Sequence, residues 1–445
     1  MPFCAYMNKS DRVMEYDSIF LRSFSQNEMK KLGFGALVIC LFTAFSFRTV
    51  FKLPEFHTQT EFVSSIYNLS NSRSDVLEIR GDIRIHGNSS TIYTASRTYT
   101  RGKNPNTWPT SIRPYARKGD TFIMNKYVTR WNIDHRVRTN LPSCDHHFKA
   151  PAMLFSAGGY SGNHFHDFSD TLIPLYLTSR QFNGKVIFLI SDQRSSWFKK
   201  YKPVLNKLSD YDTIDVDKEN EVLCSARLII GLRSHKEFDI DPLQPPHYSM
   251  GQFRHFLRST FSLRRDSVIC YKGRPRPPPR MLIISRRYNR FITNQAEIAD
   301  KARGLGFSVV VKETGWNMTV TAKQVNSFDV LMGVHGAGLT NMVFLPENGV
   351  VIQIIPFGAD LWAKPYFGLP ASDMGLRYLE YRVSLNESSL LGKYPIDGDV
   401  YRDPSAIYKK GFVEFHSVYL NKQDVTLDFD RFREVLLKAF ELVQC

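Results

Sequence analysis

The amino-acid sequence predicts an α/β protein with two Rossmann-like domains, each built on a parallel sheet, preceded by a single N-terminal transmembrane helix. Three observations predict this fold class. Short apolar runs alternate with helical patterns at the spacing of βαβ units, a proline-rich segment separates two such regions, and one long run near the N-terminus carries no charge. At 445 residues the chain exceeds what one hydrophobic core usually serves, which also favours two domains.

The uncharged run lies at residues 32–47 and has basic residues on both sides. It is shorter than the roughly 20 residues that a bilayer-spanning helix needs, but flanking lysine and arginine side chains can reach the interface. We therefore expect a cytosolic tail at 1–31 and a transmembrane signal anchor at 32–51. A buried core helix and a cleaved signal peptide are the alternatives.

Residues 52–110 are polar and rich in Ser, Thr and Asn, so we expect a stem. Four N-x-S/T sequons after the anchor fit a lumenal body that carries N-glycans, at Asn68, Asn88, Asn317 and Asn386. Four cysteines also follow the anchor: Cys144, Cys224, Cys270 and Cys445. They allow up to two disulfides in any of three connectivities. None has the spacing of a zinc site, so no metal cluster is expected.

The first domain is predicted at 111–272. An apolar run at 185–191 (KVIFLIS) suits a buried strand, a helical pattern covers 197–208, and 221–231 (EVLCSARLIIG) suits another strand. The run GRPRPPPR at 273–280 can continue neither a helix nor a central strand, so we expect an interdomain linker there.

The second domain is predicted at 281–445, with strand and helix patterns that alternate regularly. Its expected strands are 281–287, 308–313, 329–338 and 350–357, and its expected helices are 294–307, 320–328 and an amphipathic C-terminal helix within 429–443. Two such domains joined by a linker describe the GT-B architecture of nucleotide-sugar transferases.

Polar side chains follow three successive strands of the second domain. In an open parallel sheet, ligands bind beyond the carboxyl ends of the strands. Glycines in VHGAGLTN at 334–341 let the backbone approach a ligand, and the helix that follows offers N–H groups to a diphosphate. The alternative is a tight turn that needs glycine only for steric reasons. The candidate donor-binding residues are Arg286, Arg287, Glu313, His335, Gly336, Ala337, Gly338, Thr340 and Asn341.

Two of these assignments stay open from the sequence. Strand alternation lets only one of Arg286 and Arg287 face the site, where its guanidinium suits phosphate oxygens. Glu313 either binds a ribose or uracil edge or caps the helix that follows.

A second cluster occupies 158–174, GGYSGNHFHDFSDTLIP. If the segment is helical, His166 and Asp170 share one face, and a carboxylate beside an imidazole can supply a general base. The alternative is a helix N-terminus with Asp167 near its dipole and His166 in the core. Metal ligation by His164, His166 and Asp170 is conceivable, but the cluster contains no D-x-D motif of the metal-dependent transferase kind.

The sequence resembles glycosyltransferase family 61 of plants, in the grass-type clade that decorates xylan. The matching segments are IRPYARKGD at 112–120, FSAGGYSGNHFHDFSD at 155–170, ISRRYNRFITNQAEI at 284–298, GVHGAGLTNMVFLP at 333–346, and the tail from Gln353 through the helix containing Phe432. The resemblance covers about 110–445.

This resemblance implies a GT-B fold, a single-pass type II Golgi membrane protein, and inverting transfer of arabinofuranose or xylose from a UDP-sugar to xylan without a bound metal. It makes Asp170 the candidate base with His166 in support, and it places Arg286, His335 and 336–341 around the donor. The alternatives are a non-catalytic glycan-binding or scaffold member of a Golgi polysaccharide synthase complex, and an N-glycan β-1,2-xylosyltransferase. A homo- or hetero-oligomer in the Golgi is compatible with the sequence.

The formal net charge of +15 favours an anionic ligand. Nucleic acid would explain the charge but not the predicted anchor, and no recognisable nucleic-acid-binding module is present. An acyl- or phosphotransferase is disfavoured because the chain has neither a G-x-S-x-G motif nor a P-loop.

Overall fold

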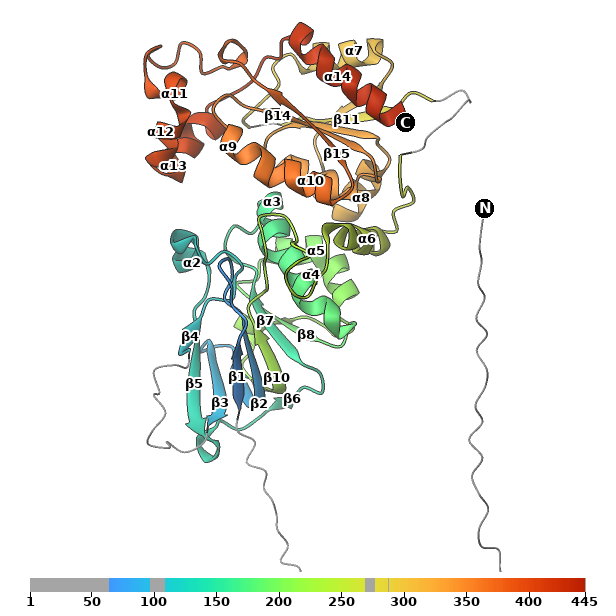
Figure 1. Cartoon of the computed structure of the whole chain (residues 1–445). Coiled ribbons are helices and arrows are strands. Elements are labelled where there is room, and N and C mark those ends of the chain that lie inside the picture. The colour runs from blue at the N-terminus through green and yellow to red at the C-terminus, as the bar shows by residue number, and fades with distance from the viewer. Residues whose placement is uncertain (1–63, 97–108, 269–276, 287, 445) are drawn as a thin grey trace, which may run out of the picture. The chain divides into compact units, whose positions relative to one another are not determined.

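The computed structural model describes residues 64–96, 109–268, 277–286 and 288–444 (Figure 1), which belong to one compact unit. The predicted cytosolic tail at 1–31 and anchor at 32–51 lie outside these described residues, as does Arg287. Within the described ranges, no helix is both long and apolar enough to cross a membrane.

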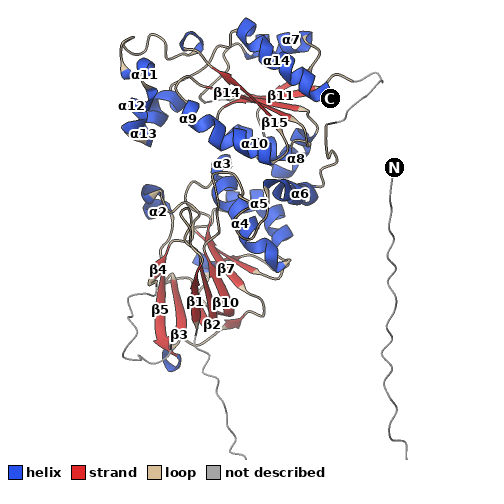
Figure 2. Ribbon diagram, viewed as in Figure 1, coloured by secondary structure: helices blue, strands red, loops and turns tan. Residues whose placement is uncertain are grey.

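The first part of the described chain forms a mixed sheet with the strand order β4-β5-β3-β2-β10-β7-β8-β9, to which β1 and β6 add through β2 and β10 (Figure 2). The strands are β1 (Ser65–Asn68), β2 (Leu77–His86), β3 (Thr91–Ser96), β4 (Ser111–Ile112), β5 (Trp131–Val137), β6 (His146–His147), β7 (Ala152–Ser156), β8 (Ile187–Ser191), β9 (Ile214–Asp215) and β10 (Val222–Ile230). Strands β10, β7, β8 and β9 are parallel, but β2 runs antiparallel to both β10 and β3. The predicted parallel sheet is therefore confirmed only in part for this domain, because β2 pairs antiparallel with its neighbours.

Strands β1 to β3 lie within the segment predicted to be a stem. In β2, the apolar residues Leu77, Ile79, Ile83 and Ile85 are buried, and charged residues stand between them. This alternation with a period of two is typical of a half-buried strand. The stem prediction is wrong for residues 65–96, and the first domain begins well before residue 111.

Helical residues share a core with Met153, Phe155 and Phe188 on one face of the first sheet. The first part has five α-helices among the described residues. They are α2 (Thr121–Tyr127), α3 (His164–His166), α4 (Ile173–Ser179), α5 (Ser195–Leu208) and α6 (Met250–Phe261). A π-helical segment, η3 (Asp167–Leu172), joins α3 to α4. The predicted strands at 185–191 and 221–231 and the predicted helix at 197–208 are confirmed as β8, β10 and α5.

The second sheet is parallel throughout, with the order β12-β11-β13-β14-β15. Its strands are β11 (Arg280–Ile284), β12 (Ser308–Lys312), β13 (Val330–Val334), β14 (Val350–Ile355) and β15 (Arg377–Arg382). Four of them confirm the predicted strands. The order reverses between β11 and β13, which makes this a doubly wound sheet whose switch point lies between those two strands.

Helices pack on both faces of the second sheet (Figure 1). Residues of α7 (Gln295–Gly304) and α14 (Phe429–Gln444) share a core with Met281 and Ile283, whereas residues of α8 (Met318–Asn326) and α10 (Leu369–Asp373) share one with Leu282 and Ile284. The predicted helices at 294–307, 320–328 and 429–443 are confirmed. Four short helices complete this part: α9 (Asp360–Ala363), α11 (Asp399–Arg402), α12 (Pro404–Lys409) and α13 (Phe412–Phe415).

The two parts share one continuous core, which includes Phe165, Phe253, Phe344 and Phe367. Helix α6 adds polar contacts, because the buried guanidinium of Arg254 donates hydrogen bonds to the carbonyl oxygens of Leu345 and Met374. These contacts join helices of the first part to the second sheet.

Candidate active site

A cavity of about 380 Å³ lies at the carboxyl ends of β11, β12 and β13, and we call it the switch-point cavity. Most of its described lining residues lie at or just after the ends of these three strands, and two come from helices α3 and α5. The lining residues are Ile284, Ser285, Arg286, Tyr288, Asn289, Glu313, Thr314, Gly315, Trp316, Met318, Ala337, Gly338, Asn341, His164 and Lys200. The convergence expected from the strand order is confirmed for Arg286, Glu313, Ala337, Gly338 and Asn341.

Gly336 makes the turn after β13. Its φ angle is 150°, and a Cβ atom at this position would lie 2.7 Å from Nη1 of Arg286 and 3.2 Å from Nη1 of Arg290. Arg290 also donates a hydrogen bond from Nη1 to the carbonyl oxygen of His335 at 2.9 Å. A side chain at 336 would therefore push both guanidinium groups away from the turn.

The guanidinium of Arg286 is held by Asn289. Its Nε donates to the Asn289 carbonyl at 2.9 Å and its Nη2 to Asn289 Oδ1 at 3.1 Å. Burial lowers the pKa of Arg286, and Glu313 opposes this effect. Arg286 thus faces the cavity as expected, with a fixed orientation.

Glu313 also lines the cavity, and the structure decides between its two predicted roles in part. The N-cap of α8 is Asn317, whose Oδ1 accepts a hydrogen bond from the backbone N–H of Val320 at 3.1 Å. The predicted capping role of Glu313 is therefore wrong. Contact between Glu313 and a bound ligand stays a prediction.

Three predicted donor-binding residues, His335, Gly336 and Thr340, do not line the cavity. His335 is buried, and its Nδ1 lies 2.7 Å from Nε2 of Gln353. Burial, with Arg290 and Arg286, lowers the pKa of His335 to about 3, so the imidazole is neutral. Thr340 is also buried, and its hydroxyl has no hydrogen-bond partner among the described residues.

His164 connects α3 to the glycine turn. Its Nε2 lies 3.2 Å from Oδ1 of Asn341, and Nδ1 lies 3.3 Å from Nζ of Lys200 and 3.1 Å from the Tyr201 hydroxyl. Burial and Lys200 lower the pKa of His164 to about 3. Neutral His164 therefore carries its proton on Nε2, which donates to the amide oxygen of Asn341, and Nδ1 accepts from Lys200.

Asp170 is fully buried and accepts hydrogen bonds on both oxygens. Arg117 donates at 2.8 and 3.0 Å, Arg73 at 3.2 Å, the Tyr115 hydroxyl at 3.0 Å, and Nδ1 of His166 lies at 2.9 Å. Glu237 pairs with the same two arginines, at 2.9 Å from Arg73 and 2.7 Å from Arg117. We call these residues the Asp170 cluster: Arg73, Tyr115, Arg117, His166, Asp170 and Glu237.

The predicted shared face of His166 and Asp170 is confirmed. Burial raises the pKa of Asp170, but Arg117 and His166 more than offset that effect and hold it well below the usual range. A carboxylate in this environment is a weak base whose oxygens are already occupied. Its geometry suits the orientation of His166 better than the removal of a proton.

His166 keeps one ring nitrogen available. Nδ1 is directed at Asp170, and Nε2 has no hydrogen-bond partner within the described residues. The side chain is 19% exposed and stacks on Tyr160 with a ring separation of 4.2 Å. With Nδ1–H donated to Asp170, Nε2 carries the lone pair that a general base needs.

A second cavity of about 820 Å³ lies beside the Asp170 cluster, and we call it the Arg117 cavity. Its described lining includes Arg73, Arg117, Glu237, Tyr160 and Lys410. Two further lining residues present aromatic rings to solvent, Phe122 at 65% and Phe412 at 50% exposure. Aromatic faces beside charged and hydrogen-bonding groups suit an extended sugar chain.

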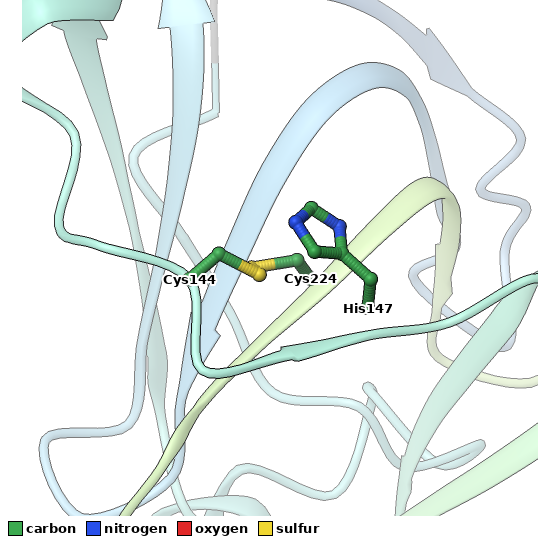
Figure 3. A group of neighbouring side chains, drawn as sticks. All are labelled: Cys144, His147 and Cys224. Atoms are coloured by element: carbon green, nitrogen blue, oxygen red, sulfur yellow. A yellow bond between two sulfur atoms is a disulfide. The ribbon is translucent and has the colours of Figure 1, made fainter.

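Among the described residues, one trio of potential metal ligands stands close together: Cys144, His147 and Cys224. Figure 3 shows the two sulfur atoms joined as a disulfide, so neither thiolate is available. This disulfide selects one of the pairings left open by the sequence, whereas Cys270 and Cys445 lie outside the described residues. The other metal site considered from the sequence consists of His164, His166 and Asp170. Both ring nitrogens of His164 and both carboxylate oxygens of Asp170 already have protein partners.

The asparagines of all four predicted sequons are exposed: Asn68, Asn88, Asn317 and Asn386. Asn317 stands at the edge of the switch-point cavity, between the lining residues Trp316 and Met318.

Several residues of the site were missed by sequence reasoning. Tyr115 and Arg117 fall within the motif at 112–120, which could have indicated them, and Arg290 falls within the motif at 284–298. Arg73, Lys200 and Glu237 carry no local signal, because each stands alone in an ordinary strand, helix or loop pattern.

Three relatives from Oryza sativa subsp. japonica are similar over most of this chain. The alpha-1,3-arabinosyltransferases XAT2 and XAT3 are 41% and 42% identical over 87% and 84% of this chain. The beta-1,2-xylosyltransferase XYXT1 is 38% identical over 88% of it. The matches cover 66% and 64% of the two arabinosyltransferases and 86% of the xylosyltransferase.

The family model named Glycosyltransferase 61 matches residues 164–352. That segment begins at the histidine that contacts Lys200 and Asn341, and it continues through the glycine turn and ends within β14 (Val350–Ile355). It thus contains most of both the switch-point cavity and the helix of the Asp170 cluster. With this match and a relative aligned over most of both chains, the protein belongs to glycosyltransferase family 61.

Proposed function

We propose that this protein is an inverting pentosyltransferase that transfers arabinofuranose or xylose from a UDP-sugar to xylan. The observation that carries the proposal is the switch-point cavity, where a fixed arginine and a glycine turn meet at the carboxyl ends of a doubly wound sheet. Relatives named as arabinosyl- and xylosyltransferases support the choice of a pentose.

In this proposal the switch-point cavity binds the donor. Arg286 pairs with the diphosphate, and backbone N–H groups of the turn at 336–338 approach it closely. Tyr288 and Trp316 line the cavity with 89% and 56% exposure, so their rings are available to stack on the uracil. Glu313 contacts the ribose or the uracil edge, and His335 supports the turn through Arg290.

The Asp170 cluster supplies the base. Nε2 of His166 takes the proton of the acceptor hydroxyl, while Asp170 holds Nδ1–H and stabilises the imidazolium that forms. Arg73 and Arg117 keep Asp170 ionised. The nucleophile attacks the anomeric carbon from the face opposite the diphosphate, which inverts the configuration at that carbon.

We also propose that the reaction needs no metal ion. Divalent cations prefer several oxygen ligands, and Glu313 is the single carboxylate among the described residues of the switch-point cavity. Protein cations there can neutralise the diphosphate instead. The acceptor xylan is assigned to the Arg117 cavity, with sugar rings against Phe122 and Phe412.

The proposed location is the Golgi membrane, with one helix at 32–51 as the anchor of a single-pass type II protein and the catalytic part in the lumen. The disulfide between Cys144 and Cys224 favours an oxidising compartment, and the exposed asparagines of four sequons fit a glycoprotein. Nothing in the proposal requires nucleic acid, and association with a second copy or another synthase subunit is compatible with it.

The test is a transfer assay with the full-length chain, xylan oligosaccharides and a panel of UDP-sugars, with and without EDTA, followed by product mass. We expect one pentose to be added from one donor, with EDTA having no effect. Transfer abolished by EDTA and restored by a divalent cation would contradict metal independence. UDP binding without turnover of any donor would contradict the enzymatic proposal and favour the glycan-binding or scaffold alternative.

A further inference from the structure

Lys200 is a lysine of α5 that lines the switch-point cavity together with Arg286 and residues 337–338 of the glycine turn. Its side chain is only 13% exposed. A buried lysine needs partners for its charge, and in this position the expected partner is a carboxylate or another anion.

The protein partners of Lys200 meet that need only partly. Its Nζ lies 3.3 Å from Nδ1 of His164, which is neutral. The nearest carboxylate oxygen, Oδ2 of Asp167, is 3.8 Å away and already accepts from the Tyr201 hydroxyl at 2.8 Å. Burial lowers the pKa of Lys200, and Asp167 opposes this effect. Its Nζ also lies 5.0 Å from the centre of the Tyr201 ring. None of these three groups gives Lys200 a short ion pair.

The charged residues that line the cavity also favour an anionic partner for Lys200. Among its described lining residues, Lys200 and Arg286 are cations and Glu313 is the one anion. Arg290 adds a positive charge behind the turn, where its Nη1 donates to the carbonyl of His335. The cavity is thus left with more positive than negative charge, which favours an anionic ligand.

Lys200 is also connected to the glycine turn through hydrogen bonds. It donates to Nδ1 of His164, Nε2 of His164 donates to Oδ1 of Asn341, and Nδ2 of Asn341 donates to the carbonyl of Gly338 at 2.9 Å. This chain fixes the distance between the ammonium group and the turn. The ammonium group and the turn are therefore held in a fixed relation, as one ligand that contacts both would need.

We infer that Lys200 binds the diphosphate of the nucleotide-sugar donor and neutralises the leaving group as the glycosidic bond to the sugar breaks. This inference rests on the proposed function and assigns to that site a cation from the first part of the chain. Lys200 pairs with phosphate oxygens that face α5, and Arg286 pairs with those that face the turn. When the bond breaks, the electron pair goes to the diphosphate oxygen and the ammonium group lies beside the charge that develops there.

The test measures binding of UDP and of uridine to the full-length chain by calorimetry, in the wild type and in three variants. Lys200→Met removes the charge, Lys200→Arg restores a cation, and Lys199→Met changes the exposed neighbour on the same helix. We expect Lys200→Met to weaken UDP binding at least about tenfold and to leave uridine binding unchanged, because uridine has no phosphate. Lys200→Arg should recover most of the affinity, and Lys199→Met should match the wild type.

The outcomes separate the inference from the function on which it rests. If Lys200→Met binds UDP within twofold of the wild type, the inference is wrong and the proposed function stands. If it loses UDP and uridine equally, Lys200 shapes the pocket and does not bind the diphosphate. If the wild type binds neither compound, the proposed function and the inference both fail. Lys200→Gln is measured in parallel, and thermal unfolding shows which of the two variants is folded.

Discussion

The Asp170 cluster and the switch-point cavity both contain several charged side chains, but these charges are paired differently in the two regions. In the Asp170 cluster, Arg73 and Arg117 each pair with both Asp170 and Glu237, so two cations meet two carboxylates at 2.7 to 3.2 Å. In the switch-point cavity, Lys200 and Arg286 face one carboxylate, Glu313. The first set of charges is paired at short distances within the protein, whereas in the second the nearest carboxylate oxygen to Lys200, on Asp167, is 3.8 Å away.

This difference assigns different tasks to the two regions. A closed, paired network holds its members in one geometry. Within it, Nε2 of His166 is the nitrogen that can accept a proton, because Nδ1 is directed at Asp170. A cavity with surplus positive charge and a tight glycine turn selects a phosphate ligand. In the proposed function, the chain therefore separates the orientation of the base from the binding of the leaving group. Substitutions of single residues can test that separation.

The largest effect is expected for His166→Gln. Removal of a positioned general base costs roughly 10² to 10⁴ in rate, so transfer to xylan should fall by about that factor. UDP affinity should stay unchanged, because His166 does not line the switch-point cavity. Initial rates and calorimetry on the same preparation measure both. Weaker UDP binding with an unchanged rate at saturating donor would show that the two regions are not separate.

Asp170→Asn should destabilise the fold as well as lower activity. The change leaves Arg73 and Arg117 facing a neutral amide, and breaking a buried ion pair in this way costs about 3–5 kcal/mol. The midpoint of urea unfolding measures the loss. Asp210→Asn is the matched control, because Asp210 forms an exposed pair with Lys185 and its removal should leave the midpoint unchanged. Equal midpoints for both variants would contradict the structural role of the cluster.

Gly336→Ala should act on the other region. The new methyl group would lie 2.7 Å from Nη1 of Arg286, and the φ angle of 150° disfavours any side chain. We expect UDP affinity to fall about tenfold, the equivalent of about 1.4 kcal/mol. Gly304→Ala is the control, since a methyl group there meets nothing within 4 Å. Unchanged UDP binding in Gly336→Ala would remove the turn from the donor site.

The smallest effect concerns a second buried aspartate, Asp239, whose environment is the reverse of that of Asp170. Burial and the neighbouring carboxylate of Asp373 raise the pKa of Asp239 to about 7. A carboxyl group with a raised folded pKa contributes stability that is fully present below its unfolded pKa and is lost as pH rises through about 7. Asp170 has a lowered pKa and contributes stability above its unfolded pKa, which is lost as pH falls through its folded pKa.

Wild-type stability should therefore decline between pH 5 and pH 8 by more than that of Asp239→Asn. Urea unfolding midpoints at the two pH values provide the comparison. The same decline in both proteins would show that Asp239 does not titrate with a raised pKa.

The second sheet was predictable almost strand by strand, and the first was not. Strands β13 and β14 are buried on both faces, so they appear in the sequence as continuous apolar runs between helical patterns. Strand β15 contains RYLEYR at the edge of the sheet and shows no such run. Strand β2 alternates apolar and charged residues, a signal that was present in the segment assigned to a stem.

The candidate site divides in the same way. Arg286, Glu313 and the glycine turn follow predicted strands, and a parallel sheet brings its strand ends together without further information. Arg73 lies 97 residues before Asp170 and reaches it from the loop between β1 and β2. Lys200 reaches the cavity from a helix of the other part of the chain. Contacts of this kind depend on how distant elements pack, which no local pattern encodes.

The most direct test of the central claim is a crystal structure of the protein with UDP bound. The account predicts the diphosphate in the switch-point cavity, between Lys200 on one side and Arg286 with the turn at 336–338 on the other. It also predicts that the Asp170 cluster keeps its ion pairs in that complex. UDP bound elsewhere, or a diphosphate held by the arginines of the Asp170 cluster, would contradict the assignment of the two regions.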